Sequence, residues 1–127
     1  MGTWGAGDFE SDGALDFLDE QVERYLGIIE DVFADAERFH LDEDAESMLI
    51  PSVRILTALA TQLDAFLPDT LDVETWKARY LAMYDAQIDG LQPVAGFKAE
   101  RRAAIAAAFD GLNQAYQAQQ KQQGAGG

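Results

Sequence analysis

The sequence predicts an all-α fold, a four-helix antiparallel bundle with an irregular N-terminal segment packed on it. Apolar residues recur at steps of three and four in four stretches of the chain, which is typical of amphipathic helices. No stretch shows the regular alternation of apolar and polar residues that would predict a strand. The joints between the four stretches are short, and short joints make consecutive helices antiparallel neighbours.

Chain length and composition predict one domain. With 127 residues, 48% of them hydrophobic, the chain is long enough to build a single core. We expect a helical domain over residues 1–116, in which residues 1–12 form a lid segment. Residues 117–127 are rich in glutamine and end in glycine, so we expect a flexible tail there.

The first predicted helix begins near Asp12, a plausible cap for its backbone N–H groups. Gly27, in its middle, costs about 1 kcal/mol relative to alanine and predicts a bend or a break. The apolar stripe of this helix consists of Leu15, Leu18, Val22, Tyr25, Ile29, Val32, Ala36 and Phe39, widened by Leu26, Ile28 and Phe33.

The second predicted helix follows a polar joint at residues 40–44. Pro51 should lie in its first turn, where a missing N–H costs little, or else kink it. Pro68 should close it. Its apolar positions are Met48, Leu49, Val53, Leu56, Leu59, Ala60, Leu63 and Phe66.

The third predicted helix starts at Asp72, a plausible N-cap, and its apolar pattern is interrupted at Gln87. Glycine and proline in residues 90–96 predict the next turn. The apolar positions are Val73, Trp76, Tyr80, Met83 and Leu91 in the third helix, and Phe97, Ile105, Ala108, Phe109, Leu112 and Tyr116 in the fourth.

The N-terminal segment combines glycines, aromatic residues and acids ahead of the first helix. Glycines allow unusual backbone angles, so we expect Trp4 and Phe9 to fold onto the bundle, either as core plugs or as part of a site. The matching residues of a known pattern are Met1, Gly2, Trp4, Gly5, Gly7, Phe9, Glu10, Asp12, Ala14 and Asp16. On these residues the chain resembles the bacterial family called domain of unknown function 4259. The resemblance implies a small, mostly helical bacterial protein and transfers no catalytic residue.

Negative charge is concentrated in the first third of the chain. Residues 1–46 hold fifteen Asp and Glu against two Arg, whereas residues 47–127 hold eight acids against seven bases. This asymmetry argues against nucleic acid and anionic membranes as ligands, because both require Lys and Arg. It favours a basic protein partner, although a solvated outer face that keeps the protein soluble is the alternative. The candidate partner-binding residues are Asp16, Glu20, Glu23, Glu30, Asp31 and Glu37, of which four are spaced by seven.

Residues that could carry catalysis are scarce. The chain has no cysteine and one histidine, His40, and we find neither a nucleophile motif nor a phosphate-binding loop. Residues 37–40 spell Glu-x-x-His, but a di-iron bundle needs two such motifs. We therefore expect no enzyme, no cofactor and no metal site. The predicted function is a non-enzymatic protein-interaction module of the bacterial cytoplasm, an immunity or inhibitor protein that binds a basic toxin or nuclease.

The sequence leaves two alternatives open. A homo-oligomeric structural module would pair the wide apolar stripe at Leu26, Ile28 and Phe33 with a second copy, giving a homodimer. A cation-binding regulator would use Asp8–Asp19, whose oxygen spacing is similar to that of a calcium-binding loop but ends in Asp instead of Glu. A modest basic patch is expected to balance the acidic helix or face solvent; it comprises Lys77, Arg79, Lys98, Arg101 and Arg102.

Overall fold

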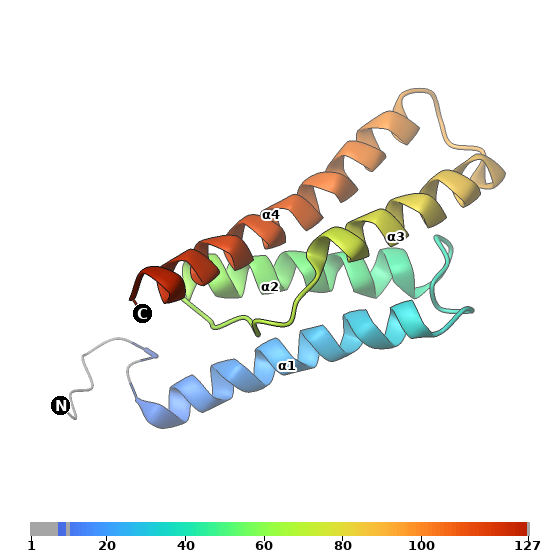
Figure 1. The fold of residues 1–127 in the computed structure, drawn as a ribbon. Coiled ribbons are helices and arrows are strands. Elements are labelled where there is room, and N and C mark those ends of the chain that lie inside the picture. Colours follow the sequence, from blue (N-terminus) through green and yellow to red (C-terminus); the bar gives the residue numbers. More distant parts are fainter. Residues whose placement is uncertain (1–7, 10, 127) are drawn as a thin grey trace.

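The computed structural model describes residues 8, 9 and 11–126, and side chains as far as residue 122. Four α-helices follow one another along the chain (Figure 1): α1 Asp12–Ala34, α2 Ile50–Gln62, α3 Val73–Gln87 and α4 Phe97–Gly126. A π-turn, η1 Ala45–Leu49, precedes α2, and a 3-10 turn, η2 Ile88–Leu91, follows α3. The described part of the chain contains no strand, and the predicted all-α fold is confirmed.

Consecutive helices run in opposite directions, so the bundle is antiparallel (Figure 1). The helix α2 packs against both α1 and α4, and α3 packs against α4. The helix α1 therefore lies at one edge of the bundle with α2 as its main helical neighbour. This position leaves a wide face of α1 open to solvent.

The apolar stripe of α1 faces the core much as the sequence predicts. Its buried residues are Leu18, Val22, Leu26, Ile29, Val32 and Phe33. The helix α1 continues unbroken through Gly27, where a Cβ would meet no atom within 4 Å. The helix has Ser11 as its N-cap in place of the predicted Asp12, because the Ser11 side chain accepts a hydrogen bond from the Ala14 N–H at 3.2 Å. It ends at Ala34, so the predicted extension of the stripe to Phe39 is wrong.

Pro51 explains the π-turn that leads into α2. Proline lacks an N–H, and its ring crowds the carbonyl one turn earlier. The chain winds residues 45–49 more widely, and the Ile50 N–H bonds the Ala45 carbonyl five residues back. Pro51 then lies within the first two positions of α2, as predicted.

The helix α2 ends at Gln62, six residues before the Pro68 that the sequence favours as its end. Asp64 has a positive φ of 56°, which turns the chain out of the helix. Residues 65–69, here called the extended segment, lie outside the helices. Burial alternates along them, since Ala65 and Leu67 are buried while Phe66 between them is 63% exposed. The prediction that Phe66 belongs to the core is therefore wrong.

The helix α4 continues to Gly126, which differs from the flexible tail expected from residue 117 onward. Its last part is held by side chains that bond the extended segment after α2. The Gln119 amide accepts from the Leu67 N–H at 2.9 Å and donates to the Ala65 carbonyl at 2.7 Å. The Tyr116 hydroxyl donates to the Asp69 carbonyl at 2.7 Å. Composition missed this helix end because Gln119 bonds backbone groups that are more than fifty residues away in sequence.

The helix α3 begins as predicted, with the Asp72 carboxylate accepting from the Thr75 N–H at 3.2 Å and from its hydroxyl at 2.7 Å. Both bonds lower the pKa of Asp72. Gln87 interrupts the apolar pattern for a structural reason, since its side chain accepts from the Leu41 N–H at 2.9 Å. The predicted core positions Leu91 and Phe97 are 44% and 43% exposed at the end of the bundle.

Phe9 is half-buried and packs against the core, in line with its expected role as a plug. The expectation for Trp4, and the rest of the family-like pattern up to Gly7, lie outside the described residues.

Candidate functional site

The outer side of α1 carries a continuous acidic surface, here called the acidic face. A helix turns about 100° per residue, so all of its carboxylates fall within a sector of roughly 120°, on the side away from the buried stripe. Every one of these side chains is exposed. The acidic face consists of Asp12, Asp16, Asp19, Glu20, Glu23, Glu30 and Asp31.

Within the described residues, no carboxylate of the acidic face takes part in an ion pair. The single base of α1, Arg24, lies with its guanidinium carbon 5.9 Å from the centre of the adjacent Tyr25 ring. The ion pairs that form join Arg38 to Asp44, Lys77 to Asp110, Lys98 to Asp89, Arg101 to Glu46 and Arg102 to Asp85. All five lie outside α1, so the negative charge of the acidic face is uncompensated locally.

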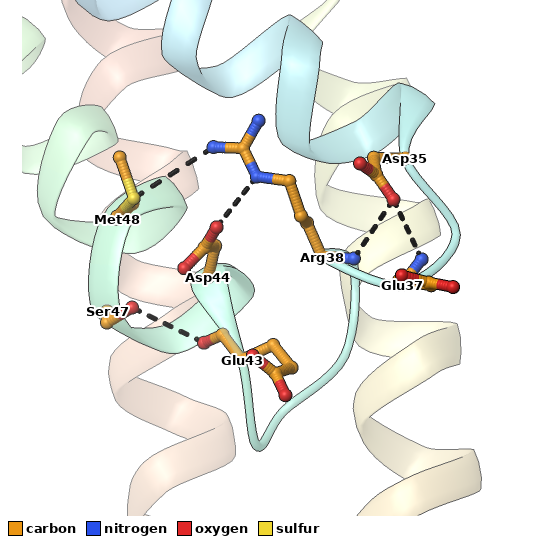
Figure 2. A network of polar contacts seen from close by, with 7 residues as sticks. All are labelled: Asp35, Glu37, Arg38, Glu43, Asp44, Ser47 and Met48. Carbon is orange, nitrogen blue, oxygen red and sulfur yellow. Dashed lines mark hydrogen bonds and ion pairs between the residues drawn. The ribbon is translucent and has the colours of Figure 1, made fainter.

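Five of the six predicted partner-binding residues share the acidic face, and Glu37 does not. Glu37 lies beyond the end of α1, where the Asp35 carboxylate accepts from the backbone N–H groups of Glu37 at 2.9 Å and Arg38 at 3.3 Å (Figure 2). An Asp that bonds the backbone two and three residues ahead stabilises a turn. Because of this turn, Glu37 does not continue the row of carboxylates that the seven-residue spacing predicts along the helix.

Asp44, which follows this turn, is bound by Arg38. The Arg38 Nε donates to Asp44 at 2.7 Å, and its Nη2 lies 4.0 Å from the Met48 sulfur (Figure 2). The hydrogen bond that Arg38 donates to Asp44 raises the pKa of Arg38. This half-buried pair joins the two ends of the loop between α1 and η1.

Glu46 forms a clamp that joins η1, α3 and α4. Its carboxylate accepts two bonds from Arg101, at 2.9 and 3.0 Å, and one from the Tyr80 hydroxyl at 2.6 Å. Burial, followed by the bond to Glu46, raises the pKa of Tyr80, and the bond to Glu46 raises the pKa of Arg101. The three groups satisfy one another, so we interpret the clamp as structural. The sequence gives little sign of it, because residues 46, 80 and 101 are far apart along the chain.

The predicted basic patch does not balance the acidic helix. Lys77, Arg101 and Arg102 pair with Asp110, Glu46 and Asp85. The pair with Asp85 raises the pKa of Arg102 and lowers that of its partner.

Arg79 is the patch residue that reaches α1, and it does so through the backbone. Its guanidinium donates to the Phe33 carbonyl at 3.2 Å, and its central carbon lies 4.7 Å from the Phe33 ring centre and 5.5 Å from that of Phe39. A cation on one of the last carbonyls of a helix satisfies an otherwise free acceptor. Arg79 therefore caps α1 and neutralises none of its carboxylates.

The calcium-loop hypothesis for Asp8–Asp19 does not match the backbone. The helix α1 begins at Asp12, so Asp12, Asp16 and Asp19 are distributed along a helix and do not converge on one point. In the described ranges, no group of three or more His, Asp or Glu residues could hold a metal ion. His40 lies in the turn, where its Nδ1 accepts from the Asp42 N–H at 3.1 Å.

None of the described helices combines the length and the apolar character needed to cross a membrane. A family model described as Domain of unknown function (DUF4259) matches residues 2–122. Neither the curated proteins nor the solved structures contain a match to this chain.

Proposed function

This chain belongs to the family described as Domain of unknown function (DUF4259), and we propose that it is a non-enzymatic interaction protein that binds a basic protein partner through the acidic face of α1. The observation that carries the proposal is the combination of seven exposed carboxylates on one helix face with the absence of any ion pair to them among the described residues. Like charges this close repel one another and destabilise the compact state. A cationic partner would remove that cost.

The structure of the surroundings supports a preformed surface. The helix α1 lies at the edge of the bundle, its inner stripe is buried, and Arg79 caps its last turn. A rigid helix holds its carboxylates in place before binding, which reduces the entropy lost on association. Complementary charge also speeds encounter by orders of magnitude at low salt. The proposed partner is a bacterial toxin or nuclease, for which this protein acts as the cytoplasmic immunity protein or inhibitor.

The homodimer alternative requires an apolar surface that is already packed against the core of the bundle. Leu26 and Phe33 are buried inside the bundle, and Ile28 packs against the same core. The homodimer predicted through these three residues is therefore not proposed. The cation-binding alternative is withdrawn as well, because residues 12–19 are helical.

The test compares two variants with the same change in net charge. Glu23→Gln, Glu30→Gln and Asp31→Asn remove three of the seven negative charges of the acidic face, whereas Glu74→Gln, Glu100→Gln and Asp42→Asn neutralise three exposed acids elsewhere. Immobilised wild-type protein and both variants are exposed to extract of the native host at low salt, and bound proteins are eluted at high salt and identified. We expect a basic protein on the wild type and on the second variant, and its loss from the first. Equal retention by all three proteins would contradict the proposal.

An immunity role also requires that the captured protein be toxic and that this protein neutralise it. Expressed without its inhibitor, the partner should arrest growth, and co-expression of wild-type protein should restore it. The variant changed at Glu23, Glu30 and Asp31 should restore growth far less well. A captured partner without toxicity would leave an interaction protein of another kind and remove the immunity role.

A further inference from the structure

Phe66, an aromatic side chain that is 63% exposed, lies between two hollows of the surface. One, of about 400 Å³, lies between α1 and the extended segment and is here called the α1 hollow. The other, of about 520 Å³, lies between the ends of α2 and α4 and is here called the α4 hollow. Phe66 lines both of them, so a single bound segment could contact both hollows across this ring.

The outward position of Phe66 is imposed by the fold. Ala65 and Leu67 are 1% and 2% exposed, and the Gln119 side chain bonds the backbone of both. Side chains alternate along an extended segment, so anchoring these two neighbours directs Phe66 into solvent. A large apolar side chain fixed at a strongly charged surface is typical of a contact site, since aromatic anchors dominate binding energy.

The α1 hollow suits a cationic side chain with an apolar stem. Asp19 and Glu23 of the acidic face and Asp69 of the extended segment line it, and none of them takes part in an ion pair within the described residues. Val22 and Pro68 supply apolar surface between these carboxylates. Arginine and lysine bury their methylene stems on such surface while the charged group meets carboxylates.

The α4 hollow suits an apolar side chain. Ala60 and Ala115 form a largely buried methyl floor, with Ala118 beside them. Two of the four polar side chains in the lining are engaged within the protein: Gln119 bonds the backbone through both ends of its amide, and the Thr61 hydroxyl donates to the Thr57 carbonyl at 2.8 Å. Asp64 and Gln122 also line the hollow. An apolar side chain packed on the alanines would leave the hydrogen bonds of Gln119 and Thr61 intact.

We infer that the docking segment of the partner carries an arginine or lysine next to an apolar residue. The cation enters the α1 hollow, the apolar side chain enters the α4 hollow, and Phe66 separates them. This inference rests on the proposed function, because it takes the negative charge of α1 as the attraction that brings the partner. It adds that recognition occurs at the first half of α1, next to the extended segment, and that charge alone is insufficient.

The experiment uses the full chain labelled with ¹⁵N and three capped peptides at low salt: acetyl-Gly-Arg-Leu-Gly-amide, and the same peptide with Ser in place of Leu or Gln in place of Arg. We expect the Arg-Leu peptide to shift the amide signals of Leu67, Asp69 and Ala118. The Arg-Ser peptide should shift the first two only. The Gln-Leu peptide should bind weakly at either hollow, because long-range attraction is lost.

Two double variants change the charge of α1 equally at different places. Asp19→Asn with Glu23→Gln alters the α1 hollow and should weaken Arg-Leu binding about fivefold, the effect of roughly 1 kcal/mol. Glu30→Gln with Asp31→Asn lies outside both hollows and should weaken it less than about twofold. Phe66→Ala should reduce binding at both hollows, and its exposed position makes a folding defect easy to exclude by circular dichroism.

The outcomes separate this inference from the proposed function. Shifts confined to α1 near Glu30 and Asp31, or equal losses in the two double variants, would overturn the inference and leave the acidic face as the binding surface. Equal affinities for the Arg-Leu and Arg-Ser peptides would overturn the role of the α4 hollow. No shift with any peptide, while the host extract still yields a basic partner, would also overturn the inference; failure of both experiments would remove the proposed function too.

Discussion

The carboxylates of α1 and those of the helix pair α3 and α4 differ in whether they form ion pairs. On α1, seven carboxylates face one base and form no ion pair among the described residues. On α3 and α4, Lys77 bonds Asp110 and Arg102 bonds Asp85, each across the interface between the two helices. Both regions bury apolar side chains in the same core, so they differ in the pairing of their charged surface residues.

This contrast distinguishes charged side chains that stabilise the fold through ion pairs from carboxylates that have no such role. Ion pairs across a helix interface help to fix which helix lies beside which, although each exposed pair adds only about 0–1 kcal/mol. An unpaired row of carboxylates contributes nothing of that kind and adds repulsion. A surface with a structural cost and no structural benefit is a reasonable place to look for function.

The largest expected effect concerns the clamp between η1, α3 and α4. Glu46→Ala should lower the free energy of unfolding by about 2 kcal/mol, because Arg101 and Tyr80 lose their shared acceptor in a partly buried site. Urea unfolding followed by circular dichroism measures the change. The matched control is Glu43→Ala, an exposed acid three residues earlier that should cost less than about 0.5 kcal/mol. Equal effects would mean that the clamp does not contribute.

A smaller effect of opposite sign is expected on the acidic face. Neutralising Glu23, Glu30 and Asp31 together should raise the free energy of unfolding by about 0.5–1 kcal/mol at low salt, since it relieves repulsion on one helix. The gain should shrink as salt screens the charges. Thermal unfolding at two salt concentrations measures it, with the variant at Asp42, Glu74 and Glu100 as control. A destabilised acidic-face variant would show that these carboxylates have structural partners after all.

The smallest expected effect is the acid dependence of the α3–α4 ion pairs. The Arg102 guanidinium lowers the pKa of Asp85 in the folded protein. A carboxyl group with a lowered folded pKa adds stability above its unfolded pKa, and that stability is lost as the pH falls through the folded pKa. Asp85→Asn should therefore flatten the loss of stability between neutral pH and about pH 3. Urea unfolding across that range checks it, and Glu74→Gln should leave the slope nearly unchanged.

Periodicity predicted the helices of this protein well and their ends less well. The sequence predicts the apolar stripe of α1 and the Asp72 cap correctly, because both depend on residues that are close in sequence. The end of α2 was misplaced, since Phe66 fits the helical period but is turned out by Asp64 and by Gln119, a residue more than fifty positions away. Gln87 was read as an interruption for the same reason, because its partner Leu41 is distant in sequence.

The candidate site shows the same division. The carboxylates of α1 were identified correctly as one face, because a helix fixes the directions of its own side chains. Glu37 was wrongly placed on that face, since the turn held by Asp35 ends the helix first. The two hollows beside Phe66 had no signal in the sequence, because they are formed by segments that meet only in the folded bundle.

The sequence by itself determined the all-α class, the positions of the helices and the concentration of negative charge on the first of them. These properties follow from residue spacing and from side chains within a few positions of each other. Tertiary structure decided which bases pair with which acids, where α2 and α4 end, and that Phe66 stands in solvent between two hollows. Those outcomes depend on contacts between residues far apart along the chain, whose geometry exists only once the core has packed.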